Sequence, residues 1–277
     1  MSASWAPAGR RLDNPLLLAA GIDRDGKRAA ELLALGFGGV EFGTVGIVPV
    51  SGRHAGAAAL AQRLAPFAAR RQRPALGINL GLAADAPDAD DWLAGVPLCA
   101  PAADFLTLNL SAESAAAWRA PASASRLWRA LCGAREVRDA WAAAHGRRPA
   151  LVLKLPLDAS FPPLAGLAAR AGVDALLVVL PERGALAEGA DVSAFERARA
   201  GLAADCGRLP ELLAVGGIRR ATDVAALLAA GASALQVHGA FAELGDGCVD
   251  DLLFPARSRS RDVRESGDFP PSSSGRA

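Results

Sequence analysis

Tyrosine is absent from this chain of 277 residues, and aromatic side chains make up only 5% of it. Large rings therefore contribute little packing, and the core must be built mainly from alanine, leucine and valine. Hydrophobic residues account for 52% of the chain and charged residues for 21%. This balance excludes a mostly disordered protein and is sufficient for a full hydrophobic core.

Cysteine and histidine are also scarce, with four and three residues respectively. The cysteines lie far apart and form no CxxC pair, whereas structural zinc sites and disulfide frameworks need closely spaced or numerous ligands. The sequence therefore predicts no metal site and no disulfide framework. The cysteines are Cys99, Cys132, Cys206 and Cys248.

Excess charge of either sign is missing, since 30 basic and 29 acidic residues leave a net charge of +1. No face is expected to attract nucleic acid or anionic lipid along its whole length. No apolar run approaches the roughly 20 residues of a membrane span, and the N-terminus lacks the apolar core of a signal peptide. We therefore expect a cytoplasmic protein with no nucleic-acid partner and no integral membrane segment.

Short apolar runs alternate with longer Ala/Leu-rich stretches from about residue 14 to residue 254. The runs read as buried parallel strands and the stretches as the helices that connect them. Eight such units in about 250 residues favour a (β/α)8 TIM barrel over an open doubly wound sheet. The expected strands are 16–20, 39–42, 75–79, 105–109, 150–154, 175–179, 211–215 and 234–238. The expected helices include 27–35, 126–144, 164–171, 195–204 and 222–230.

Three regions follow from this pattern. Residues 1–13 form a short N-terminal lead, residues 14–254 the barrel, and residues 255–277 a disordered tail rich in Pro, Ser and Arg. Gly36 and Gly231 each follow a helical stretch and are expected to adopt the left-handed conformation that ends a helix.

The active site of such a barrel lies at the carboxyl ends of its strands. The seventh strand is followed by Gly216 and Gly217, and the eighth by Gly239 and Ala240. Backbone N–H groups at these turns can approach an anion without interference from side chains, which favours a phosphate site. The alternative is that the glycines only turn the chain.

Lys154 ends the fifth strand and is one of only two lysines in a chain that otherwise uses arginine. A compact cation at the barrel mouth suits a reduced flavin, which is anionic near N1. The alternative is a lysine that snorkels from a strand end. Asn79 and Asn109 end the third and fourth strands, where two amides can read the polar edge of a flat heterocycle.

These segments, taken in order, resemble the dihydroorotate dehydrogenase family, in particular its quinone-linked class. The resemblance covers residues 14–241. It implies an FMN-dependent oxidation of dihydroorotate to orotate, a step of pyrimidine biosynthesis, with a hydride passing to flavin N5 and a proton to a serine base. The matching blocks are NPLLLAAGIDRDG, LGFGGVEFGTV, LGINLG, DFLTLNLS, LVLKLP, GVDALLVV, AVGGI and LLAAGASALQVHGAF.

The resemblance also implies which residues bind the cofactor and the substrate. Substrate contacts fall on Arg24, Asn79, Asn109 and Ser114. Cofactor contacts fall on Ala20, Gly21, Thr44, Asn79, Asn109, Lys154, Gly216, Gly217, Gly239 and Ala240.

The catalytic stretch departs from the family pattern, because Ala112 stands where the family has its base serine. A methyl group cannot accept a proton. Ser111 and Glu113 are the neighbouring candidates, and Ser114 replaces the family's second asparagine. The family's lysine after the first strand is Arg24 here, and His238 stands where the family has tyrosine.

Other polar segments of the family are also missing, including the block before the third strand, the end of the sixth strand and the glycine-rich loop before the seventh. Each unmet hydrogen bond in a buried site costs about 1–3 kcal/mol. We therefore expect flavin binding to be less affected by these losses than turnover of the substrate. One hypothesis is an FMN-dependent oxidoreductase acting on a small molecule, with impaired or altered chemistry and an open choice of electron acceptor.

The other hypothesis is a non-catalytic homologue that binds FMN or another phosphate ligand. Only about a dozen residues precede the first strand, so we expect no N-terminal helical pair of the kind that docks the quinone-linked class to membranes.

Overall fold

Eight parallel strands close into a barrel, because each strand pairs with its sequence neighbours and the first pairs with the last. The computed structural model describes residues 4–82, 89–181, 189–205 and 209–254. All eight predicted strands are present, and the predicted (β/α)8 TIM barrel is confirmed. The strands are β1 Leu16–Leu18, β2 Gly39–Val45, β3 Ala75–Leu80, β4 Phe105–Asn109, β5 Ala150–Pro156, β6 Ala175–Val179, β7 Glu211–Val215 and β8 Ala234–Val237.

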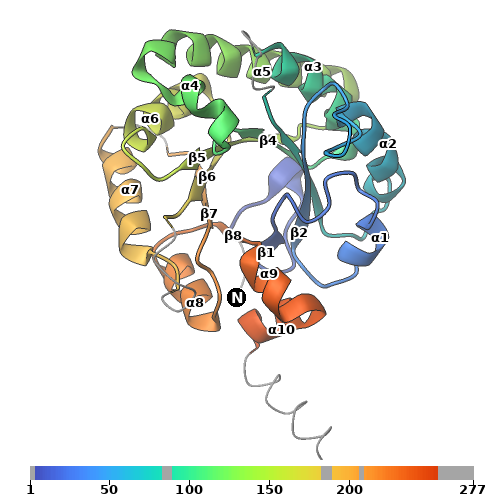
Figure 1. Ribbon diagram of the computed structural model, residues 1–277, viewed down its shortest axis with the longest axis vertical. Helices are drawn as coiled ribbons and strands as arrows, with labels where there is room; N and C mark the ends of the chain where they lie inside the picture. The colour runs from blue at the N-terminus through green and yellow to red at the C-terminus, as the bar shows by residue number, and fades with distance from the viewer. Residues whose placement is uncertain (1–3, 83–88, 182–188, 206–208, 255–277) are drawn as a thin grey trace, which may run out of the picture.

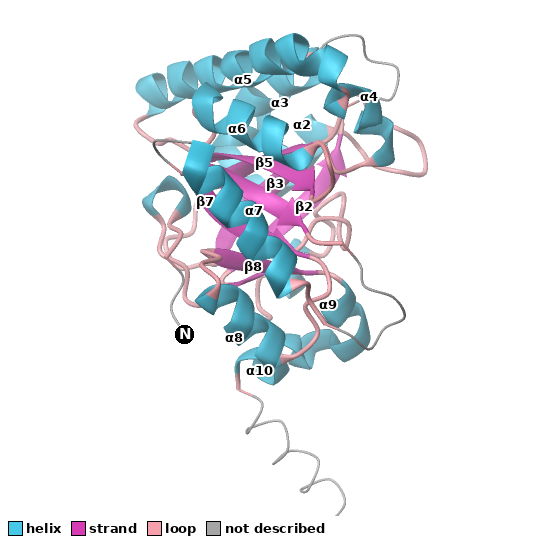
Figure 2. Ribbon diagram, turned by 90° about the vertical axis from the view of Figure 1, so that its left-hand side faces the viewer, coloured by secondary structure: helices cyan, strands magenta, loops and turns pink. Residues whose placement is uncertain are grey.

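Helices surround the strands, as the view along the barrel shows (Figure 1), and in the side view the strands run between helices above and below (Figure 2). The α-helices are α1 Ala29–Leu32, α2 Ala57–Ala68, α3 Asp90–Cys99, α4 Ala116–Arg119, α5 Ala124–His145, α6 Phe161–Ala171, α7 Val192–Asp205, α8 Ala221–Ala229, α9 Gly239–Leu244 and α10 Cys248–Leu253. Short 3₁₀ turns lie at Pro7–Gly9, Ala100–Ala102, Glu113–Ala115, Pro121–Ser123 and Gly245–Gly247.

The helices agree less closely with the sequence pattern than the strands do. The stretch 27–35 contains only the four-residue helix α1. The pattern does not predict α2 and α3, in which Pro66 and Pro97 interrupt the helical signal. Gly36 and Gly231 have φ values of +83° and +97°, so their predicted left-handed conformation is confirmed. The predicted disordered tail, 255–277, lies outside the described residues.

The interior of the barrel forms a hydrophobic core of its own, separate from the core between strands and helices. Trp5 and Leu12, from the N-terminal segment, join this interior core, and the Trp5 ring packs edge-on against Phe105 with centroids 5.0 Å apart. The ring of Phe105 also occupies the space beside Gly77, where an added Cβ would lie 2.1 Å from Cζ. The N-terminal end of the barrel is therefore filled, and its interior is not an open pore.

Buried ion pairs join the loops at the N-terminal ends of the strands. Asp104, which precedes β4, accepts the Leu76 N–H at 2.8 Å and pairs with Arg73 and Arg147. Burial alone would raise the pKa of this carboxyl, but the two guanidinium groups and the N–H bond outweigh it and lower the pKa. This end of the barrel is thus tied together by charge as well as by packing.

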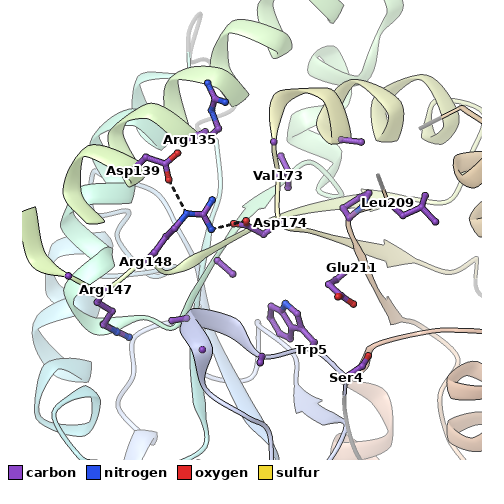
Figure 3. Close-up of a pocket in the computed structure, with 18 residues that line it drawn as sticks. Ser4, Trp5, Arg135, Asp139, Arg147, Arg148, Val173, Asp174, Leu209 and Glu211 are labelled. Carbon is purple, nitrogen blue, oxygen red and sulfur yellow. Dashed lines mark hydrogen bonds and ion pairs between the residues drawn. The ribbon is translucent and has the colours of Figure 1, made fainter. Parts of the chain in front are cut away.

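Asp174, which precedes β6, is the second anchor at this end. It accepts the Leu151 N–H at 2.8 Å and pairs with the buried Arg138 and with Arg148. Figure 3 shows Arg148 held between Asp174 and Asp139 at the wall of a cavity of about 960 Å³. There Arg148 is paired with both Asp174 and Asp139. Residues on the N-terminal face of such barrels serve stability rather than chemistry.

No helix within the described ranges is both long and apolar enough to cross a membrane.

Candidate active site

A polar layer occupies the interior of the barrel at the carboxyl ends of the strands. Side chains alternate along a strand, so residues that follow the interior apolar positions at a spacing of two also face inward. Val152 belongs to the interior core, and Lys154 comes two residues later; Phe105 is followed in the same way by Thr107 and Asn109. The polar layer consists of Glu41, Asn79, Thr107, Asn109, Lys154 and Gln236.

Glu41 is the buried anion of this layer, with 1% of its surface exposed. Its carboxylate accepts hydrogen bonds from the Thr107 hydroxyl, from Gln236 Nε2 at 3.0 Å and from the Ala20 N–H at 3.3 Å. A buried charge needs such partners to offset its lost hydration. Glu41, on β2, therefore joins β4, β8 and the segment after β1 beneath the barrel mouth.

Asn79, Thr44 and Asn109 form a hydrogen-bonded cluster above Glu41. Asn79 Oδ1 accepts from the Thr44 hydroxyl at 2.8 Å and from Asn109 Nδ2 at 3.0 Å. The Asn79 Nδ2 atom is buried and has no acceptor among the described residues. An unpaired buried donor is costly, so this amide can bind an acceptor atom of a ligand.

Asn109 is already satisfied by its neighbours. Its Nδ2 donates to Asn79 and, at 3.3 Å, to Thr44, while its Oδ1 accepts from both the N–H and the hydroxyl of Ser111. A substrate contact by Asn109 would require one of these bonds to break. Asn79 is thus the better placed of the two amides to meet a ligand.

Lys154 lies in the same layer, and its ammonium group makes no hydrogen bond or ion pair with the described residues, although its backbone oxygen accepts the Leu110 N–H at 3.0 Å. Burial lowers the pKa of its ammonium group, and the negative charge of Glu41 opposes that shift. Burial of the ammonium therefore costs free energy, and the charge of Glu41 offsets only part of that cost. A cation held in this way suits a ligand that becomes negatively charged.

The turns after β7 and β8 are neighbours, because Val215 at the end of β7 pairs with Gln236 of β8. Gly216 and Gly217 have φ values of +109° and +68°. An added Cβ on Gly217 would lie 2.8 Å from the Gly189 oxygen, so close chain packing by itself requires glycine there. Gly239 begins α9 and Ala240 is buried within it.

The segment expected to carry the catalytic base follows β4. Ala112 is exposed and presents only a methyl group, and Glu113 and Ser114 are exposed as well. Arg119 donates to the backbone oxygens of Leu110 and Ala112, at 2.6 and 3.0 Å, and so fixes the segment. No side chain of this segment presents a free, buried proton acceptor.

The remaining predicted residues lie at the edge of the mouth. The Gly21 N–H donates to the Gly43 oxygen at 2.7 Å, and an added Cβ on Gly21 would lie 3.5 Å from His238 Nε2. Arg24 is exposed and makes no hydrogen bond or ion pair with the described residues. Because its guanidinium group has no partner among the described residues, Arg24 can bind an anionic ligand.

Sequence reasoning missed Glu41, Thr107 and Gln236. Each is a lone polar residue within an otherwise apolar strand, a signal that could have been used because such residues need buried partners. Gln236 Oε1 also lacks a hydrogen-bond donor among the described residues. Within that same part of the chain, no group of His, Cys, Asp and Glu could hold a metal ion.

The residues of the mouth fit a flavin mononucleotide. The unpaired Asn79 amide offers a donor for a ring carbonyl and Lys154 a cation for the ring. A phosphate would meet the backbone of the turns after β7 and β8, where Gly216 and Gly217 are also packed against the backbone of Leu180 and Gly189. Fold and site together define a (β/α)8 barrel whose mouth can hold a polar, anionic cofactor.

Comparison with known proteins shows which family within this class the chain resembles. The chain is 34% identical to the dihydroorotate dehydrogenase (quinone) of Rhodospirillum rubrum, over 91% of this chain and 78% of the relative. It is 31% identical to the enzyme of that name from Flavobacterium lutescens, over 94% of this chain and 85% of the relative. No family model matches the chain.

A solved structure shares the fold. The Eimeria tenella dihydroorotate dehydrogenase, crystallised with ferulenol, superposes with a TM-score of 0.76 at 19% identity, over 94% of this chain and 84% of that one. With relatives above 30% identity over most of both chains, the chain belongs to the dihydroorotate dehydrogenase (quinone) family.

Proposed function

We propose that this protein is an FMN-dependent oxidoreductase of the dihydroorotate dehydrogenase type whose reaction with dihydroorotate is slow or whose substrate is altered. The observation that carries the proposal is the combination of Lys154, a buried lysine whose charge Glu41 only partly compensates, with an alanine, Ala112, where the base serine is expected. The first retains the means to bind flavin. The second removes the usual means of accepting a substrate proton.

Bound FMN would supply hydride acceptance at N5 of its ring. Asn79 and Lys154 would bind the ring, the second by opposing the charge that develops near N1 on reduction. Ala20, Gly21 and Thr44 would lie against the ring, and Gly216, Gly217, Gly239 and Ala240 would contact its phosphate. The internal bonds of Asn109 suit a residue that positions Asn79 and Thr44.

The residues expected to bind the substrate differ from those of the family. Arg24 retains a positive charge for an acidic substrate, but as a planar fork in place of a compact ammonium. Ser114 offers a hydroxyl in place of a carboxamide, and both residues are exposed. These changes suit a substrate with an acid group whose remaining polar edges differ from those of dihydroorotate.

The second candidate is a non-catalytic barrel that binds FMN or another phosphate ligand. The same loss at Ala112 favours it, because a ligand site can survive without a proton acceptor. The electron acceptor is a separate question, and the quinone in the names of the relatives is the first to test.

Anaerobic reduction of the flavin distinguishes these functions. The full chain is reconstituted with FMN, and the flavin absorbance is followed after addition of dihydroorotate and of a panel of related cyclic acids. Slow bleaching by dihydroorotate, or faster bleaching by another acid, supports the oxidoreductase. A yellow protein that no donor bleaches supports the non-catalytic alternative, and a chain that binds no FMN overturns both flavin functions.

A further inference from the structure

The strongest unassigned feature near the mouth is the side chain of Arg219, which extends from the turn after β7 to the start of α9. Its Nη2 atom lies 3.5 Å from the position that a Cβ on Gly239 would occupy. The guanidinium group therefore lies beside the backbone of Gly239 and spans the gap between the two glycine turns. The helices that follow these turns, α8 and α9, are neighbours in the ring (Figure 1).

The backbone of Arg219 is held firmly in this place. Asp223, from α8, accepts the N–H groups of both Arg219 and Arg220, at 3.0 and 2.9 Å. Gly217, two residues earlier, is packed against the oxygen of Gly189. The side chain of Arg219 thus starts from a fixed turn, and only its own rotamers decide where the charge lies.

The present partner of Arg219 is Glu243 of α9. The two side chains form an ion pair in which 28% of the arginine and 50% of the glutamate side chain are exposed. Exposed pairs of this kind contribute little to stability, because water and salt screen them. The arginine can therefore exchange this carboxylate for a better acceptor at small cost.

We propose that Arg219 is a phosphate-binding residue of this site and that Glu243 is the internal carboxylate that competes with the ligand for it. The inference rests on the proposed function, since it assigns an additional ligand to the FMN phosphate. A phosphate dianion binds a guanidinium in the bidentate, charge-assisted geometry that a single carboxylate also uses, and with a larger charge. Glycine at 239 leaves space for that contact.

The proposal predicts opposite effects for the two members of the pair. Arg219→Gln removes a charge-assisted contact, so the Kd for FMN should rise about tenfold or more. Glu243→Gln removes the competing carboxylate and its repulsion of phosphate, so the Kd for FMN should fall. Arg219→Lys retains the charge without the fork and should lie between wild type and Arg219→Gln.

Riboflavin is the matched ligand, because it has the same ring and lacks the phosphate. The Kd of each protein for FMN and for riboflavin is measured by quenching of flavin fluorescence. Riboflavin binding should be unchanged in all three variants, which also shows that they fold. Arg135→Gln, at a half-buried arginine near the opposite end of the barrel, is the control for loss of one positive charge.

Two results would overturn the inference, and they have different consequences for the proposed function. If wild type binds FMN but Arg219→Gln and Glu243→Gln leave the FMN-to-riboflavin ratio unchanged, Arg219 does not bind phosphate and the proposed function stands. If wild type binds neither flavin, the inference and the proposed function both fail. Tighter FMN binding by Glu243→Gln is the decisive supporting result, because misfolding does not produce it.

Discussion

The hydroxyl of Ser111 donates a hydrogen bond to Asn109 Oδ1 at 2.8 Å, and the backbone N–H of the same residue bonds that oxygen at 2.9 Å. Ser111 is thus turned back toward the end of β4. Because the neighbouring position is Ala112, the serine nearest to the expected base position is occupied in holding the amide cluster. Under the proposed function, Ser111 supports the residues that would bind the flavin and does not serve as the base.

Restoring a serine at the base position should therefore increase the rate of the reaction. In Ala112→Ser, the rate of flavin reduction by dihydroorotate should rise about 100-fold, the usual contribution of a positioned general base. The measurement is stopped-flow bleaching of the flavin under anaerobic conditions. Ala116→Ser, at an exposed alanine of α4, is the control. An unchanged rate in a variant that still binds FMN would mean that lost substrate contacts, and not the base, limit the reaction.

Lys154 should destabilise the protein when no flavin is bound. Since its pKa is lowered in the folded state, the unfolded chain binds the proton more tightly, and stability rises as pH rises between the lowered pKa and the ordinary value. Lys154→Met should make the apoprotein more stable at pH 7, by about 1 kcal/mol, and remove this pH dependence. Urea denaturation at pH 7 and pH 10 tests both effects.

Lys154→Met should also change the redox behaviour of bound FMN. Without the cation, the midpoint potential of bound FMN should fall, because the reduced ring loses its compensating charge. Lys27→Met, whose side chain is 70% exposed, is the matched control and should change neither quantity. A potential unchanged by Lys154→Met would place the lysine away from the flavin.

Asp104 should be a main source of stability at the N-terminal end of the barrel. Asp104→Asn leaves Arg73 buried without its carboxylate and should cost about 3–5 kcal/mol, as breaking a buried pair does. Because its pKa is lowered in the folded state, the contribution of Asp104 is complete above the unfolded pKa and is lost as pH falls through the folded value.

Chemical denaturation of wild type and Asp104→Asn between pH 3 and pH 7 measures this contribution, and the difference between them should shrink toward the acid end. Glu31→Gln, which removes one partner of an exposed pair with Arg28, should leave the denaturation midpoint nearly unchanged. Equal effects of the two substitutions would contradict the role given to burial.

Gly217 should be required by packing as well as by conformation. Gly217→Ala places a methyl group 2.8 Å from the Gly189 oxygen at a φ of +68°, and should cost roughly 2–3 kcal/mol. Gly146 has nearly the same φ, +67°, but nothing within 4 Å of an added Cβ. Gly146→Ala should therefore cost about 1 kcal/mol, from the backbone alone. Equal losses in urea denaturation would show that the chain near Gly189 moves aside.

Local patterns located the strands well and the helices less well. A buried parallel strand is a continuous apolar run, and all eight such runs proved to be strands of the barrel. Helices depend on a weaker periodic signal, which Pro66 and Pro97 interrupt in α2 and α3 although tertiary packing holds both helices. The sequence also placed Asn79, Asn109 and Lys154 in the carboxyl-terminal halves of their strands, although β3 continues to Leu80 and β5 to Pro156.

By itself, the sequence determined the barrel and its eight strands, and it places an alanine, Ala112, where a base serine is expected. Only the tertiary structure decided which polar groups are partners. Gln236 reaches Glu41 across 195 positions because β8 closes on β1, and Arg219 meets Glu243 because consecutive turns become neighbours at the mouth. The physical reason is that a hydrogen bond depends on distance in space, which closure of the barrel sets and local residue patterns do not encode.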